Sequence, residues 1–185
     1  MRTLQPIQTI PLTNIVGIDL SLTATGLCSR SPRGGYSTEE FSPKKKVLIA
    51  RWVAIRKYIR DFLPLSKKCF VFIEGYAFAA RSRSVTGLAE IGGIIRMDLY
   101  DHGIEYIEIA PTMLKKFVTG KGNVKKDLIL KEVYRRWNMD LESHNMADAY
   151  GLVKLGEAAF GLPGDWTKDQ LKIAKAINNQ ILNRE

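Results

Sequence analysis

Cysteine and histidine are scarce in this sequence, with two of each among its 185 residues. Cys28 and Cys69 stand in apolar or strand-like surroundings, which favours reduced, buried thiols over a disulfide bond or a zinc site. No apolar run is long enough to cross a membrane, and residues 1–12 lack the basic and apolar regions of a secretory signal. From these absences we expect a cytoplasmic protein that is not bound to a membrane.

Acidic residues are also few, since the sequence has 19 Asp and Glu but 28 Lys and Arg. The formal net charge is therefore +9. Such a balance favours an anionic partner such as nucleic acid, and the alternative is a generally basic protein without such a partner. The length and an apolar content of 45% suffice for one domain with a sizeable core. We therefore assign residues 1–185 to a single domain, with 165–185 as a C-terminal helical extension.

The hydrophobic pattern predicts an α/β protein with the element order βββ-α-β-α-β-α-α-α-α. Residues 15–18 and 69–73 are continuous apolar runs, typical of strands that are buried on both faces. Further strands are expected at 25–29, 36–41 and 104–110, which makes a mixed sheet of about five strands flanked by helices. Helices are expected at 44–63 (with Pro43 in the first turn), at 85–100, from 111, at 124–137 (capped by Asn123), at 143–160 (capped by Ser143), and at 167–183.

Acidic residues follow both buried strands, because Asp19 ends the first and Glu74 ends the fourth. If the two strands are parallel neighbours linked by a helix, both carboxylates lie at the same edge of the sheet. Asp148 and Asn145, three residues apart, share one face of the helix that follows Ser143. Carboxylates at such places are costly to desolvate unless they are compensated, and oxygen ligands suit hard divalent cations. These residues are interpreted either as the metal ligands of an enzyme that hydrolyses phosphodiesters or as separate turn and cap residues.

Basic and aromatic residues surround these positions in the sequence. A glycine-bearing loop at 119–123, followed by a helix, is a candidate phosphate-binding site. A solvated basic surface explains these residues equally well. The aromatic residues after Glu74 fit either base stacking or core packing. The candidate contacts to nucleic acid are Tyr76, Phe78, Arg81, Arg83, Lys121, Lys125 and Lys126. The glycine-rich helix at 85–100 is a candidate dimer interface, and intramolecular packing explains its glycines equally well.

Three collinear segments resemble the motifs of RuvC-type Holliday-junction resolvases. IVGIDLSLTATG at 15–26 resembles the opening strand, FIEG at 72–75 the second acidic motif, and ADAYGL at 147–152 the last one. The basic segment at 111–126 is similar as well, and the resemblance covers roughly residues 14–156. The pattern resembles that of the small phage-encoded members of the family.

The resemblance implies an RNase H-like fold and a homodimer that cuts four-way DNA junctions in the cytoplasm of a bacterial host cell. It also implies two Mg²⁺ ions per active site, with Mn²⁺ as a substitute. Asp19 would bridge the ions, Glu74 and Asp148 would each bind one, and Lys121 would contact the scissile phosphate. The family places Asp or His three residues before its last Asp, where this sequence has Asn145 beside His144.

Asn145 leaves three interpretations open. The amide oxygen serves as a weaker ligand, His144 replaces it, or an Asp→Asn change has inactivated the site. The leading hypothesis is a structure-selective endonuclease. The alternatives are a junction-binding protein with impaired cleavage and another RNase H-like nuclease that acts on RNA–DNA hybrids.

Overall fold

A five-stranded mixed sheet forms the centre of the molecule in a computed structural model that describes residues 7, 13–64, 68–75 and 83–183. The side chains of residues 83–85 and 126 lie outside this description. The strands follow the order β3-β2-β1-β4-β5, with β1 to β3 antiparallel and with β4 and β5 parallel to β1. Their bounds are β1 Asn14–Asp19, β2 Thr25–Arg30, β3 Tyr36–Phe41, β4 Cys69–Glu74 and β5 Glu105–Ile109. The expected mixed sheet of five strands is confirmed.

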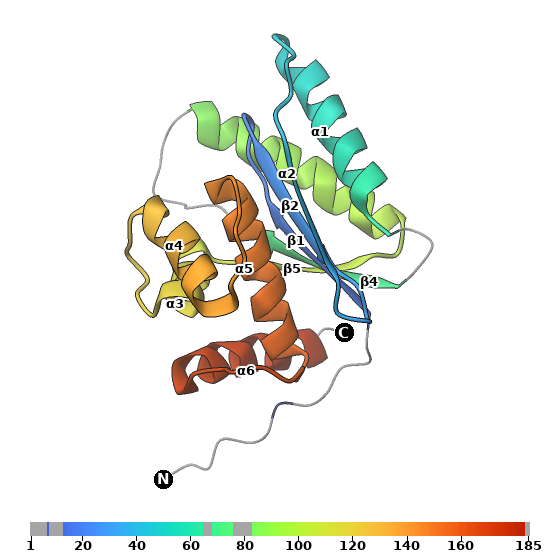
Figure 1. The fold of residues 1–185 in the computed structure, drawn as a ribbon. Helices are drawn as coiled ribbons and strands as arrows, with labels where there is room; N and C mark the ends of the chain where they lie inside the picture. Colours follow the sequence, from blue (N-terminus) through green and yellow to red (C-terminus); the bar gives the residue numbers. More distant parts are fainter. Residues whose placement is uncertain (1–6, 8–12, 65–67, 76–82, 184–185) are drawn as a thin grey trace.

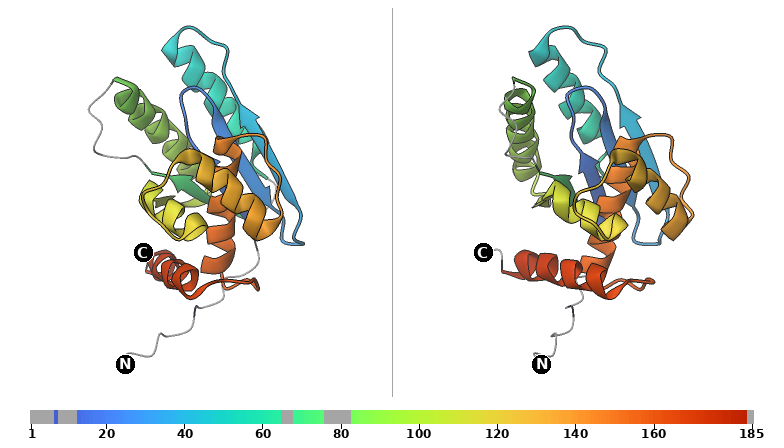
Figure 2. Two further views of the ribbon diagram at one scale, coloured as in Figure 1. Left: turned by 60° about the vertical axis from the view of Figure 1, so that its left-hand side comes forward. Right: turned by 90° about the vertical axis from the view of Figure 1, so that its left-hand side faces the viewer.

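Helices cover both faces of the sheet (Figure 1). Helices α1 Leu48–Phe62 and α2 Arg83–Asp101 lie on one face. Helix α5 His144–Ala159 crosses the other face, and α3 Pro111–Thr119, α4 Lys126–Trp137 and α6 Lys168–Leu182 pack around it (Figure 2). The observed element order matches the predicted one.

Two hydrophobic cores follow from the alternation of side chains along the central strands. In β1, Ile15 points to the core under α5, whereas Val16 and Ile18 point to the core under α1 and α2. In β4, Phe70 and Phe72 alternate in the same way with their apolar neighbours. Successive strand residues face opposite sides, so an uninterrupted apolar run fills both cores at once.

Helix α5 lies unusually close to the sheet because glycines face it. A Cβ atom on Gly17 would come within 2.1 Å of the Ala149 carbonyl oxygen, and one on Gly26 within 2.1 Å of the Asn145 carbonyl oxygen. Neither position has room for a side chain. The first two turns of α5 are therefore fixed directly above β1 and β2.

The predicted starts of two helices are wrong. Helix α1 begins at Leu48 rather than near Pro43, and Val47 at its N-cap makes no side-chain capping bond. Three consecutive lysines at 44–46 would place positive charge at a helix N-terminus, where the helix dipole disfavours it. The Lys45 carbonyl instead accepts bonds from the Arg51 guanidinium at 3.1 and 3.0 Å.

Helix α4 begins at Lys126 with Lys125 at the N-cap, so Asn123 does not cap it. Residues 121–125 remain a loop, and Thr119 joins this loop by donating its hydroxyl to the Lys121 carbonyl at 3.0 Å. Side chain–backbone bonds of this kind favour a turn over a further helical turn.

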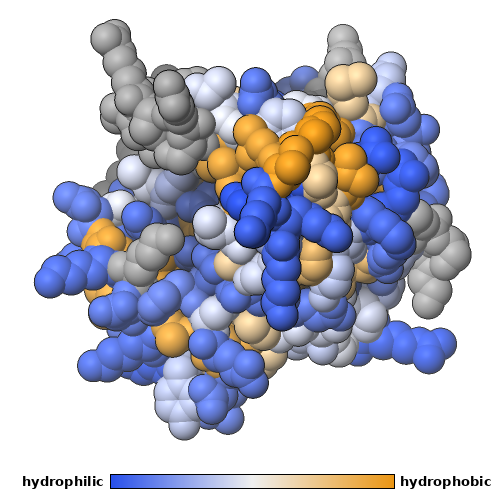
Figure 3. Space-filling model, turned by 90° about the horizontal axis from the view of Figure 1, so that it is seen from above, coloured by the Kyte–Doolittle hydropathy of each residue, from blue (hydrophilic) through white to orange (hydrophobic). Residues whose placement is uncertain are grey.

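The surface seen from above carries a cluster of apolar side chains among charged ones (Figure 3). The exposed apolar residues at the start of α1 are Val47, Leu48, Ile49 and Val53. Among the described residues, no helix is long and apolar enough to span a membrane.

Candidate active site

Asp19 and Glu74 meet because β1 and β4 are parallel neighbours that end at the same edge. The strands pair with Ile18 opposite Ile73, and each acid is the next residue and the last of its strand. Beyond Glu74 the chain is held to the adjacent strand, since the Gly75 amide donates to the Ile109 carbonyl at 2.8 Å. The carboxyl edge of parallel strands is where α/β proteins place their ligand sites.

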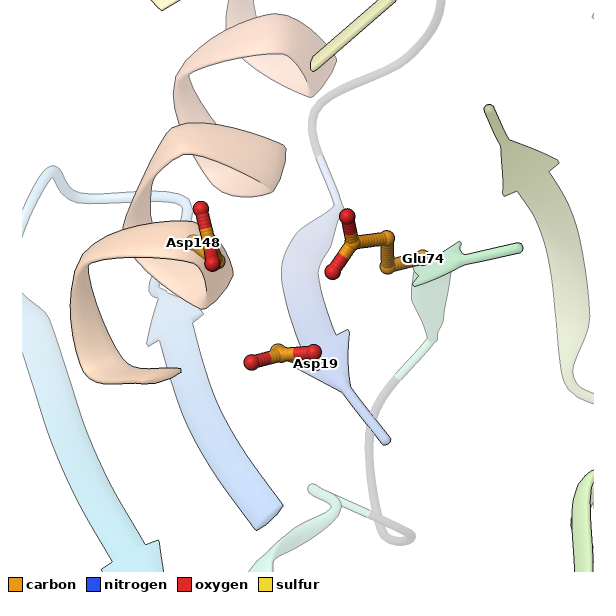
Figure 4. A group of neighbouring side chains, drawn as sticks. All are labelled: Asp19, Glu74 and Asp148. Atoms are coloured by element: carbon orange, nitrogen blue, oxygen red, sulfur yellow. The ribbon is translucent and has the colours of Figure 1, made fainter. Parts of the chain in front are cut away.

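Asp148 reaches this edge from the opposite layer. The Ser143 hydroxyl caps α5 by accepting a bond from the Met146 amide at 3.1 Å, which defines where the helix begins. The contact between Gly17 and the backbone of Ala149 then fixes the first turns over β1. As a result the Asp148 side chain points toward Asp19 and Glu74 (Figure 4).

Asp19, Glu74 and Asp148 form one compact acidic group. One ligand oxygen from each carboxylate lies within 4.8 Å of the others. Asp19 and Asp148 are buried, and Glu74 is half-buried. Three carboxylates this close repel one another, and a divalent cation bound between them relieves the repulsion. Hard oxygen ligands at this spacing fit Mg²⁺ or Mn²⁺ better than a soft metal.

Asn145 lies on the same helix, one turn before Asp148, above the boundary between β2 and β3. Its Nδ2 donates to the Glu40 carboxylate at 2.9 Å. Glu40 was not expected from the sequence. The signal that identifies it is the register of the β1–β2–β3 meander, in which Gly26 pairs with Asp19 on one side and with Glu40 on the other.

His144 makes a different contact. Its Nε2 lies 3.3 Å from a carboxylate oxygen of Asp127 on α4. In the described part of the chain, the group of His, Cys, Asp and Glu residues able to share a metal consists of the three acids without His144. The geometry therefore pairs His144 with Asp127 and Asn145 with Glu40.

The candidate DNA contacts are only partly described. Tyr76, Phe78 and Arg81 lie outside the described residues. Arg83 and Lys126 begin α2 and α4, and their side chains also lie outside the description. Lys121 and Lys125 are exposed in the loop before α4.

Known proteins resemble both the sequence and the fold. The family model "Crossover junction endodeoxyribonuclease RuvC" matches residues 15–153, which include all three acids. Crossover junction endodeoxyribonuclease RuvC of Synechococcus sp. (strain CC9311) is 27% identical over 108 residues, covering 57% of this chain and 67% of the relative. The protein of the same name from Brachyspira hyodysenteriae is 30% identical over 80 residues, covering 43% of this chain and 50% of the relative.

Two solved structures share the fold. Thermus thermophilus RuvC superimposes with a TM-score of 0.59 at 16% identity, covering 76% of this chain and 90% of that one. T. thermophilus RuvC in complex with a Holliday junction substrate gives a TM-score of 0.60 at 14% identity over the same shares. The expected RNase H-like fold is thereby confirmed. Because the family model spans most of the sequence, this chain belongs to the family of crossover junction endodeoxyribonuclease RuvC.

Proposed function

We propose that this chain is a structure-selective DNA endonuclease that resolves four-way junctions by metal-dependent phosphodiester hydrolysis. The observation that carries the proposal is the meeting of Asp19, Glu74 and Asp148 in a member of the RuvC family. Its relatives are named crossover junction endodeoxyribonucleases. The structurally similar T. thermophilus protein is described in complex with a Holliday junction.

The acidic group would supply the ligands for two Mg²⁺ ions, with Mn²⁺ as a substitute. Asp19, at the centre of the sheet, would serve both ions, Glu74 and Asp148 would each hold one, and Asn145 would add a neutral oxygen. When bound, a metal pair supplies a hydroxide nucleophile and neutralises charge on the leaving oxygen. The residues of this chain hold their oxygens in place through the ends of two strands and one capped helix, so the ligands need little reorganisation.

Basic residues beside the acidic edge bind the DNA backbone in this proposal. The net charge of +9 and the exposure of Lys121 and Lys125 support it. Lys121 contacts the scissile phosphate or its neighbours. The other proposed contacts are Tyr76 and Phe78 on unpaired bases, and Arg81, Arg83, Lys125 and Lys126 on the backbone. A phage origin and a cytoplasmic place of action stay predictions.

A homodimer would present two active sites to one four-way junction, whose symmetry it matches. Helix α2 supports this arrangement, because its outer face exposes Met97 and Tyr100 to 68% and 82%. We therefore place the dimer interface on α2.

The test is a cleavage assay with a synthetic four-way junction, a linear duplex of the same sequence and an RNA–DNA hybrid. Each substrate is incubated with Mg²⁺, with Mn²⁺ or with a chelator. We expect paired symmetric nicks in the junction that require metal. Asp148→Asn should lower the cleavage rate at least about 100-fold and leave junction binding in place, because a metal ligand is worth several kcal/mol in the transition state. Asp140→Asn, an exposed acid outside the group, is the matched control.

Two outcomes would support the alternatives. Selective junction binding without cleavage, with activity regained by Asn145→Asp, would identify a junction-binding protein whose cleavage Asn145 impairs. Preference for the hybrid would identify a different nuclease of the same fold. Equal cutting of junction and linear duplex would contradict junction selectivity.

A further inference from the structure

The Asn145 amide is held by a contact on the side of the helix that faces β3. Its Nδ2 donates to Glu40 Oε2 at 2.9 Å, across 105 residues of sequence. Hydrogen bonds to a charged acceptor are among the stronger ones in proteins, and this bond joins the first turn of α5 to the edge strand. The contact therefore defines the orientation of the amide.

Asp19, Gly26 and Glu40 form a row across three strands. Gly26 pairs with Asp19 on β1 and with Glu40 on β3. Paired residues of adjacent strands project to the same face, so both acids face α5 with one glycine between them. The backbone of Asn145 lies on that glycine, since its carbonyl oxygen would be 2.1 Å from a Cβ there. Asn145 thus stands between the two carboxylates.

In the carboxamide of Asn145, the direction of the nitrogen determines the direction of the oxygen. The nitrogen and the oxygen are the two branches of one planar group, so a nitrogen directed to Glu40 turns the oxygen away from Glu40. Asp19 lies on the other side of the row. A free Asn side chain could present either branch to Glu40, whereas the bond fixes the nitrogen there and leaves the oxygen directed elsewhere.

We propose that Glu40 is a positioning residue that makes Asn145 a metal ligand. This inference rests on the proposed function, in which Asn145 contributes a neutral oxygen. Glu40 orients the amide and polarises it, because a carboxylate that accepts the N–H increases the negative charge on the carbonyl oxygen. Glu40 also restores, one residue farther out, the negative charge that Asn lacks relative to Asp. Outer partners of this kind commonly change metal affinity by about 10- to 100-fold.

Mn²⁺ binding to the DNA-free full chain tests the proposal, measured by electron paramagnetic resonance or calorimetry. Glu40→Ala should weaken binding about 10-fold. Glu40→Gln keeps a hydrogen-bond acceptor but removes the charge, so it should weaken binding less. Combining Glu40→Gln with Asn145→Asp exchanges amide and carboxylate, and should restore the affinity of the unsubstituted protein. Glu40 is exposed, so these variants are expected to melt at the temperature of the unsubstituted chain.

Glu39→Gln is the matched control. Glu39 precedes Glu40 on the same strand, and its carboxylate accepts the Tyr58 hydroxyl on the opposite face. The Glu39→Gln variant should leave Mn²⁺ binding unchanged. This result separates the effect of the contact between Glu40 and Asn145 from an effect of net charge. A bond that only ties α5 to β3 would lower the melting temperature of Glu40→Ala without changing the affinity for Mn²⁺.

Three results would overturn the inference. They are an unchanged Mn²⁺ affinity in Glu40→Ala, an equal loss in Glu39→Gln, and no recovery in the exchanged pair. If any of these occurs while the unsubstituted chain still cuts junctions, the proposed function stands and only the role of Glu40 is lost. If the unsubstituted chain binds no Mn²⁺ and cuts no junction, the proposed function itself fails, and this inference fails with it.

Discussion

Asp19 and Asp148 are 8% and 6% exposed, whereas Glu74 is half-buried. The two buried carboxylates come from opposite layers of the fold, one from the sheet and one from the helix above it. Their side chains have little freedom to turn, since the backbone of α5 touches the sheet at Gly17 and Gly26. At the scale of residues, the site is thus preorganised by burial, and Glu74 is its most accessible acid.

Tyr58 provides a pH-dependent test of the contact made by Glu39. The Tyr58 hydroxyl donates to the Glu39 carboxylate, and this bond raises the pKa of Tyr58 from 10 to about 12. A raised pKa means that the bond contributes stability in full below pH 10 and loses it as the pH rises through about 12. We expect Glu39→Gln to move this ionisation back toward pH 10.

The measurement is the ultraviolet absorbance of tyrosinate as the pH is raised, with Tyr58→Phe subtracted to isolate one residue among seven tyrosines. An ionisation at the same pH in Glu39→Gln and in the unsubstituted chain would show that the bond is absent in solution.

Helix α5 is the element on which both the core and the site depend. It touches every strand from β1 to β4 and packs against α3, α4 and α6. Most of its residues are buried, including the polar Glu157. Glu157 is compensated by Arg30 at 2.5 Å, by Lys154 and by the Tyr36 hydroxyl, so its charge is paired inside the fold. These contacts join the helix to β2 and β3.

Gly156 tests how tightly α5 packs. A Cβ there would come within 2.7 Å of the Phe72 ring and 2.8 Å of the Ile15 side chain. We expect Gly156→Ala to lower the free energy of unfolding by about 1–3 kcal/mol, because overpacking outweighs the gain in helix propensity. Urea unfolding followed by circular dichroism measures the change.

Gly93→Ala is the matched control for this prediction, since Gly93 is also helical and has open space at its Cβ. It should leave stability unchanged or raise it by up to about 1 kcal/mol. Equal stability of the two variants would contradict the close packing of α5.

At the scale of the whole molecule, the helices on the two faces of the sheet differ in what they contribute. The layer of α3 to α6 contributes one acid to the site, and the layer of α1 and α2 has the most exposed apolar side chains of the described residues. Met97 on α2 is 68% exposed and Tyr100, three residues later, is 82% exposed, which gives α2 an exposed apolar face. The proposed homodimer accounts for it by burying this face against a second copy.

Met97→Glu tests the dimer. A charge in the middle of an apolar interface is costly to desolvate, so we expect a shift from dimer to monomer in sedimentation velocity. Tyr134→Glu, on the exposed face of α4 at 55% exposure, is the control and should leave the oligomeric state unchanged. A chain that is monomeric before substitution would refute the α2 interface, as would an unchanged dimer in Met97→Glu.

Local patterns in the sequence were enough to predict the sheet, the order of elements and the places of three acids. Continuous apolar runs indicate buried strands, and Ser143 predicts the start of α5 because its hydroxyl caps the helix within a few residues. Asp19 and Glu74 could be expected at one edge, because parallel strands linked by a helix end together. Each of these inferences needs only short-range chemistry or a general rule of topology.

The two missed helix starts, near Pro43 and Asn123, have local reasons, namely clustered lysines and a bond between Thr119 and Lys121. Only the tertiary structure decided how the first turn of α5 meets the sheet. The bond between Asn145 and Glu40 depends on the register of three strands and on how closely a helix approaches a glycine. Such long-range contacts result from the packing of whole elements, whose relative positions no local sequence pattern specifies.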